Sequence, residues 1–141
     1  MKGNLIKTML IILVVIALIG AIALIAVLKL TGEKDQSTPS ADEIVESSID
    51  IPEITTNLAD GRYVKISFKI QTNSKEGKEE AEKRDFQIKN IIIEELSEMK
   101  AESFKGKKGM TSFEERLKQQ INQIMQNGKV EQVYITSFVL Q

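Results

Sequence analysis

The sequence contains no cysteine and no histidine among its 141 residues. Without cysteine the chain has no disulfide bond and no thiolate metal site. Without histidine it lacks the commonest general base and the commonest metal ligand, which disfavours a small enzyme. A folded domain in this chain must therefore be held together by its hydrophobic core, which about ninety residues are enough to form.

Charge is missing from residues 8–28, TMLIILVVIALIGAIALIAVL, which are almost entirely apolar. As a helix with a rise of about 1.5 Å per residue, this run matches the ~30 Å hydrocarbon core of a bilayer. The run has no polar face, so it predicts a transmembrane helix. The alternative is a cleaved signal peptide, because Ala21-Ile22-Ala23 has the form of a cleavage site. Apolar residues continue through Leu28, however, and we expect the anchor to be retained.

The cations around this span set its expected orientation. Lys2 and Lys7 precede the span without an acidic residue, whereas the lysines that follow it are accompanied by Glu33 and Asp35. Short basic tails tend to stay in the cytoplasm. We therefore expect a cytoplasmic tail (1–7), a single membrane span (8–28), a polar linker (29–50) and a domain outside the cytoplasmic membrane (51–141).

Two short patterns lie in the anchor and the linker. Ala17, Gly20 and Ala21 share one side of the predicted span and form a candidate face for packing against another transmembrane helix. There is no GxxxG motif, so contact with lipid explains this face equally well. In the linker, Ser40 and Glu43 have the spacing of a capping box, which predicts a short helix after them.

Alternation of apolar and polar residues predicts the strands of the domain. In residues 62–72 every second side chain is apolar, which indicates a strand with one buried and one wet face. A short strand is expected before it, at 54–58, with Asp60-Gly61 as the turn between them. A last strand is expected at 130–140, and its apolar residues on both faces predict that it is better covered.

Apolar residues at steps of three and four predict two helices between these strands. The first spans 78–100, and Phe86 and Ile93 are expected to widen its buried stripe. A loop with two glycines follows, and Ser112 is expected to begin the second helix, which ends at Gly128. The order strand-strand-helix-helix-strand predicts an α+β fold, a small antiparallel sheet with two helices on one face. The expected stripes are Ile88, Ile91, Ile92, Leu96 and Met99, then Phe113, Leu117, Ile121 and Ile124.

The remaining residues indicate neither catalysis nor a cofactor. Of the 19 Lys and Arg, two lie before the span, and none of the 20 Asp and Glu does, which leaves 17 against 20 and a net charge of −3. That balance does not favour nucleic-acid binding. Lys105, Lys107 and Lys108 can meet phosphate or acidic lipid, although a solvated loop explains them better. We expect no metal, no cofactor and no small-molecule substrate.

The polar face of residues 62–72 is a candidate surface for oligomerisation. An antiparallel strand at the edge of a sheet can accept a strand from a neighbouring copy. Lysines at the same positions can instead protect that edge from pairing, and the sequence does not separate the two interpretations. The candidate residues are Arg62, Lys65, Ser67, Lys69 and Gln71.

The chain as a whole resembles the flagellar basal-body-associated FliL family. The resemblance rests on the short tail, single span and polar linker, and then on several motifs of the domain. The ending VYITSFVLQ is the most specific of them, since members of the family typically end with Phe-x-x-Gln. The other motifs are Asn57 to Asp60, Arg84-Asp85 through Ile92, Leu96-Ser97, Leu117, Ile121-Asn122 and Gly128-Lys129-Val130.

The resemblance implies a non-enzymatic, single-pass membrane protein at the bacterial flagellar basal body. FliL-like proteins associate with the stator units of the motor, support rotation, swimming, swarming and chemotaxis, and can assemble into rings around a stator. Their external domain resembles the stomatin/prohibitin-type fold. Stator proteins, membrane lipid and further copies of the chain are thus the expected partners. A generic membrane-anchored binding or sensor module is the alternative, and it predicts a defined ligand pocket.

Overall fold

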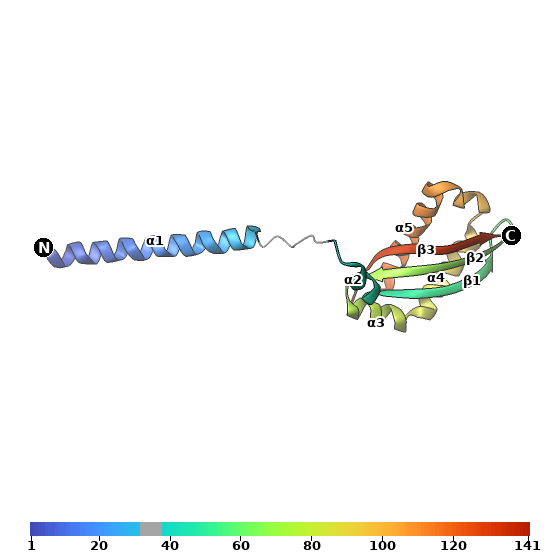
Figure 1. Ribbon diagram of the computed structural model, residues 1–141, viewed down its shortest axis with the longest axis horizontal. Coiled ribbons are helices and arrows are strands. Elements are labelled where there is room, and N and C mark those ends of the chain that lie inside the picture. Colours follow the sequence, from blue (N-terminus) through green and yellow to red (C-terminus); the bar gives the residue numbers. More distant parts are fainter. Residues whose placement is uncertain (32–37) are drawn as a thin grey trace. The chain divides into compact units, whose positions relative to one another are not determined.

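The computed structural model describes residues 1–31 and 38–141, and the chain forms two compact units, 1–39 and 40–141. The first unit is built on one long helix, α1 (Lys2–Thr31), shown in Figure 1. Its stretch Lys2–Lys29 is long and apolar enough to cross a membrane. The expected span therefore lies inside a helix that also includes most of the basic tail, while residues 32–37 of the expected linker lie outside the described residues.

The second unit begins with the short helix α2 (Ala41–Glu46). The Glu43 backbone N–H donates to Oγ of Ser40 at 3.3 Å, and the Ser40 backbone N–H donates to Oε2 of Glu43 at 2.8 Å. This reciprocal pair is the capping box that the sequence predicted. It fixes the point at which the chain enters the folded unit.

Three antiparallel strands form one sheet, in which β2 (Tyr63–Thr72) lies between β1 (Ser48–Asn57) and β3 (Val130–Leu140). β1 begins earlier than the expected strand and runs through residue 51, where the sequence placed the start of the domain. The turn after β1 is the expected one. Gly61 has a φ of +84°, which suits glycine, and the Leu58 N–H donates to the Arg62 carbonyl at 2.8 Å.

β3 contains a bulge that the alternation of its sequence concealed. Phe138 lies opposite Ile66, but Ile135 lies opposite Phe68, so Thr136 is an extra residue between the two pairs. The bulge moves alternate residues to the same face, and Ile135 and Phe138 both pack against the core. The expectation that this strand is better covered than β2 is therefore wrong, because β3 is an edge strand with one core-facing side.

The connection from β2 to β3 contains more helices than the two expected. The expected first helix is divided at Arg84, whose ψ of 11° departs from the helical value. The elements are α3 (Lys75–Lys83), α4 (Asp85–Glu98), the short 3₁₀ helix η1 (Ala101–Phe104) and α5 (Gly106–Ile124). Figure 1 shows α3, α4 and α5 on one face of the sheet.

Two glycines have roles other than those expected. Gly109 lies in the first turn of α5 rather than in a loop, and a Cβ there would collide with the Ser103 carbonyl oxygen. Ser112 is consequently inside α5 and does not cap it. Gly128 does not cap the helix either, because α5 ends at Ile124. A side chain on Gly128 would collide with the backbone of Gly77, so this glycine allows two segments to touch.

The core lies between the inner face of the sheet and the helices. The expected inward residues of β2 are 0–1% exposed, and the aromatic rings of Phe68 and Phe113 lie 6.1 Å apart. The predicted helix stripes are buried or pack against this core. Phe86 and Ile93 do not join them, because they are 70% and 41% exposed on the outer side of α4. The core residues shared by sheet and helices are Val64, Ile66, Phe68, Ile70, Ile88, Ile92, Leu96, Phe113, Leu117 and Ile121.

Candidate functional surfaces

The candidate oligomer surface does not lie at an edge of the sheet. β2 is the central strand, hydrogen-bonded to β1 on one side and to β3 on the other. β2 therefore has no open edge along which a strand of another copy could pair, and the expectation that it is an edge strand is wrong. An antiparallel sheet with one open face gives its central and edge strands the same alternation, so the sequence pattern did not distinguish them.

Both true edges of the sheet resist strand pairing. β1 contains Pro52 within a break in its register between Ile51 and Ile54, and proline has no N–H to donate. On β3 the backbone N–H of Ile135 donates to Oε1 of Glu114 on α5 at 3.0 Å. A proline, a bulge and a covering side chain are common means of blocking an edge. Contacts between copies are thus better sought on faces of the domain than on its strand edges.

The outer face of the sheet retains most of the candidate residues. Lys65 and Ser67 are half-buried, and Lys69 forms an ion pair of 2.8 Å with Asp50 on β1. Gln71 is buried and accepts a hydrogen bond from the Tyr134 hydroxyl at 3.1 Å. This outer face is therefore partly organised by cross-strand contacts, with its two lysines on the central strand.

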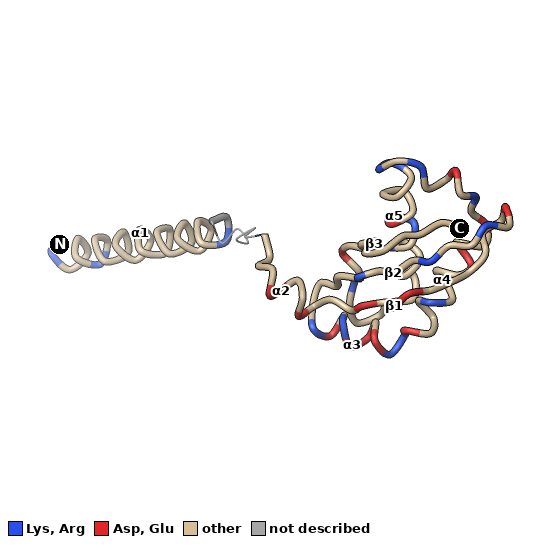
Figure 2. Tube along the Cα trace, turned by 45° about the vertical axis from the view of Figure 1, so that its right-hand side comes forward, with Lys and Arg blue, Asp and Glu red and all other residues tan. Residues whose placement is uncertain are grey.

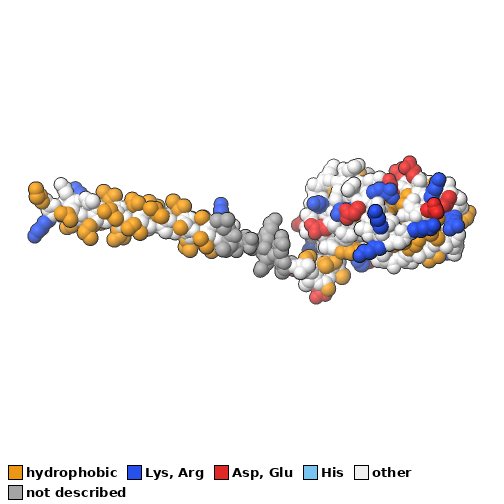
Figure 3. Space-filling view, turned by 90° about the horizontal axis from the view of Figure 1, so that it is seen from above, with side chains coloured by type: hydrophobic (Ala, Val, Ile, Leu, Met, Phe, Trp, Pro, Cys, Tyr) orange, Lys and Arg blue, Asp and Glu red, His pale blue; other side chains and the backbone are white. Residues whose placement is uncertain are grey.

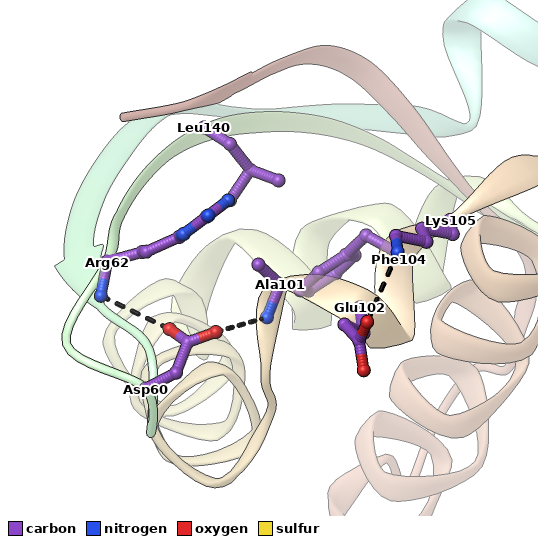
Figure 4. Close-up of a pocket in the computed structure, with 7 residues that line it drawn as sticks. All are labelled: Asp60, Arg62, Ala101, Glu102, Phe104, Lys105 and Leu140. Carbon is purple, nitrogen blue, oxygen red and sulfur yellow. Dashed lines mark hydrogen bonds and ion pairs between the residues drawn. The ribbon is translucent and has the colours of Figure 1, made fainter.

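Arg62 does not belong to that face. It lies in the turn before β2, where it lines a hollow of about 460 Å³ at the end of the sheet (Figure 4). Asp60 in the same turn accepts hydrogen bonds from the Ala101 N–H at 2.8 Å and the Arg62 N–H at 3.2 Å. These two bonds, that from Ala101 first, lower the pKa of Asp60. The carboxylate thereby joins the β1–β2 turn to η1 and shapes one wall of the hollow.

Lys and Arg side chains gather around this hollow. Arg62 and Lys105 line it, while Lys107 and Lys108 follow at the start of α5 beside a second open hollow. Lys100 directly precedes η1, and all five side chains are exposed. Figure 2 marks Lys and Arg in blue and Asp and Glu in red along the chain, and Figure 3 shows basic side chains on the face that it presents, with acidic side chains between them. We call this group of five residues the basic end: Arg62, Lys100, Lys105, Lys107 and Lys108.

Glu80 on α3 is a buried carboxylate that sequence inspection did not identify. It accepts hydrogen bonds from three successive N–H groups, those of Gln126 (2.8 Å), Asn127 (2.6 Å) and Gly128 (3.1 Å). Arg84 donates a fourth from Nε at 2.9 Å. Burial alone would raise the pKa, but the hydrogen bonds from Asn127, Gln126, Arg84 and Gly128 outweigh it and lower the pKa of Glu80 to about 2. The site ties α3 to the connection between α5 and β3.

This site could not be predicted from the sequence pattern, because Glu80 lies in a charged stretch that is typical of a solvated helix face. Its one local signal is Arg84 four residues later, a spacing common in exposed ion pairs. Between α4 and α5, Glu95 similarly contacts residues distant in sequence, Gln120 and Arg116. In the described parts of the chain no group of three or more acidic, histidine or cysteine residues is placed to hold a metal ion.

In α1 the small residues of the candidate packing face are all exposed within their own unit. Ala17, Gly20 and Ala21 follow one another at helical steps of three and one, and a Cβ added to Gly20 would meet no atom within 4 Å. The face is therefore open to another helix or to lipid, and its role stays a prediction.

The chain matches a known protein family and is similar in sequence to flagellar proteins of bacteria. Residues 48–141 match the family model described as "Flagellar basal body-associated protein FliL". "Flagellar protein FliL" of Bacillus subtilis (strain 168) is 48% identical over 124 residues, covering 86% of this chain and 89% of that protein. "Flagellar protein FliL" of Aquifex aeolicus (strain VF5) is 29% identical over 93 residues, covering 64% and 58%. The chain belongs to the FliL family of flagellar basal body-associated proteins.

Proposed function

We propose that this protein is a non-enzymatic accessory of the flagellar motor that associates with stator units and supports rotation. Swimming, swarming and chemotaxis would depend on it through the motor. The single observation that carries the proposal is family membership over residues 48–141, from the first residue of β1 to Gln141. The apolar helix supports it, because it suits a protein that works beside another membrane machine.

We further propose that the amino-terminal tail is cytoplasmic and that the folded unit lies outside the cytoplasmic membrane. The basic tail before the span supports this orientation. The absence of cysteine means that the domain needs no oxidative folding on either side. Single cysteines introduced at Asn4 and at Glu131 test the orientation. A membrane-impermeant thiol reagent applied to intact cells should label the second position and leave the first unlabelled.

We infer that copies of the chain assemble around the stator through faces of the domain, with a fold that resembles the stomatin/prohibitin type. The outer sheet face and the Ala17–Gly20–Ala21 face are the candidate contacts, one in each unit. Half-buried lysines and cross-strand polar pairs support the first face, and small side chains support the second.

The test of the proposed function combines a deletion with capture of partners. A strain lacking the protein should swim or swarm less well, and the full chain supplied in trans should restore movement. Crosslinking in intact cells, followed by purification of the chain, should recover stator proteins. Normal movement together with no stator contact would refute the proposal and favour the alternative of a general binding module.

A further inference from the structure

The basic end brings together five exposed cations at and near one hollow of the folded unit. Residues 40–141 carry 15 Lys and Arg against 18 Asp and Glu, a net charge of −3. The basic end nevertheless gathers five of these cations, with only Asp60 and Glu102 among the acidic residues lining its hollow. The rest of the unit is correspondingly acidic, so the domain carries opposite charges on different parts of its surface.

The local acidic groups offset only part of this charge. Both oxygens of Asp60 accept backbone N–H groups, which orients the carboxylate toward the turn and η1. Glu102 pairs with Lys105 at 3.2 Å, but both side chains are more than three-quarters exposed, and such pairs contribute little. Glu115, beside Lys107 and Lys108, pairs instead with Lys118 at 3.0 Å. Among the described residues Lys107 and Lys108 form no ion pair.

The kind of cation indicates the kind of ligand. Four of the five are lysines, a residue depleted in protein–protein interfaces, where arginine and aromatic residues are enriched. Lysine is a mobile point charge that binds phosphate without fixed geometry. The large side chains at the hollow, Phe104 and Leu140, are buried or half-buried and offer no protruding anchor. These features fit a flexible polyanion better than a folded acidic partner.

The basic end lies at the end of the sheet opposite to the one where the chain enters the folded unit. The chain enters the unit at Ser40, and Ser47 bonds to Thr72 at the end of β2. Arg62 lies at the opposite end of the same strand, which spans ten residues, about 33 Å at the usual rise. We propose that the basic end binds a linear polymer that carries phosphate groups at regular intervals. The compartment of that polymer rests on the proposed function, which places the folded unit outside the cytoplasmic membrane.

The test uses the full chain in nanodiscs of zwitterionic lipid and inorganic polyphosphate of defined length as the probe. Lys105, Lys107 and Lys108 are changed together to glutamine. The matched control changes Lys75, Lys78 and Lys83 on α3 to glutamine, which removes the same charge from the other part of the surface. At about 1 kcal/mol for each lysine near an anionic partner, the first variant should lose on the order of a hundred-fold in affinity.

Three outcomes decide the proposal. Binding that is strong in the parent and the α3 variant, weak in the Lys105/Lys107/Lys108 variant and steeply reduced by salt supports it. Equal binding by all three chains, or no binding by the parent, overturns it. So does preference for vesicles of acidic phospholipid over polyphosphate, which would assign the basic end to a membrane surface. A chain that fails to bind polyphosphate and still co-purifies with stator proteins refutes this inference alone, whereas the converse refutes the proposed function alone.

Discussion

Replacing Glu80 with glutamine removes the charge from the most completely bonded carboxylate in the domain while keeping its size. In the native protein the carboxylate accepts three backbone N–H groups and the Arg84 guanidinium. A glutamine amide has one acceptor oxygen and presents an NH₂ group to donors. We expect at least one backbone N–H of the α5–β3 connection to lose its partner, which costs about 1–3 kcal/mol.

The pKa of Glu80 provides a second measure of this loss. Its value in the folded protein is about 2, below the ordinary 4.5 of the unfolded chain. Such a shift corresponds to at most about 3.4 kcal/mol, and partial solvent screening reduces it to about 2–3 kcal/mol. Because the folded pKa is the lower one, this stabilisation is complete above pH 4.5 and is lost as the pH falls toward 2. We therefore expect E80Q to lower the free energy of unfolding by about 2–3 kcal/mol at pH 7.

Urea unfolding of the full chain in detergent measures the effect. The chain has two tyrosines and no tryptophan. Tyr63 and Tyr134 both lie in the sheet, so tyrosine fluorescence reports on the folded unit alone. E79Q is the matched control, because Glu79 is exposed on the same helix and loses the same charge. The reasoning is refuted if E80Q is as stable as E79Q at pH 7, or if the difference between them does not shrink between pH 6 and pH 3.

Four further changes have distinct expected results. G109A should destabilise the domain by about 1–3 kcal/mol in the same urea assay, because a Cβ there meets the Ser103 carbonyl, whereas S112A in the same helix should change it by less than about 0.5 kcal/mol. D60A should lower stability in the same assay by freeing the Ala101 N–H, and equal stability of D60A and the parent would contradict this. F86S, at an exposed position, should leave stability within about 0.5 kcal/mol; a larger loss would show that Phe86 packs inside the domain. K65E/K69E should reduce oligomer size in size-exclusion chromatography if the outer sheet face joins copies, with K75E/K83E as the charge-matched control, and unchanged assembly rules this face out.

The sequence correctly predicted which residues are buried wherever apolar side chains recur with a regular period. The alternation of β2 and the helical steps of α5 each select residues that are fully buried. Periodicity did not reveal the division at Arg84, because Ala81 is the one buried apolar side chain of α3 and the fully buried stripe of Ile88, Ile92 and Leu96 lies in α4. It also misassigned the faces of β3, since a single extra residue at Thr136 shifts the alternation by one.

The remaining differences come from contacts distant in sequence. Two glycines and three lysines between residues 105 and 109 predict a loop by propensity, yet Gly109 is in a helix because its lack of a side chain allows close packing against Ser103. The Glu80 site similarly depends on three N–H groups more than forty residues away. Neither contact can be recognised from the residues next to it in the sequence. In each case the side chain, or its absence, matches backbone atoms of another segment.

The pairing of the three strands limits how copies of this domain can contact one another. Pairing through β2 would require a free edge on that strand, but β2 is paired on both sides. Pro52 obstructs the edge of β1, and Glu114 obstructs the edge of β3. Assembly through a continuous sheet would require removing these obstructions, at the cost of the Ile135 hydrogen bond. Assembly through faces requires no such change. P52T should therefore leave oligomer size unaltered in size-exclusion chromatography, and larger assemblies after that single change would show that the β1 edge had been the controlling surface.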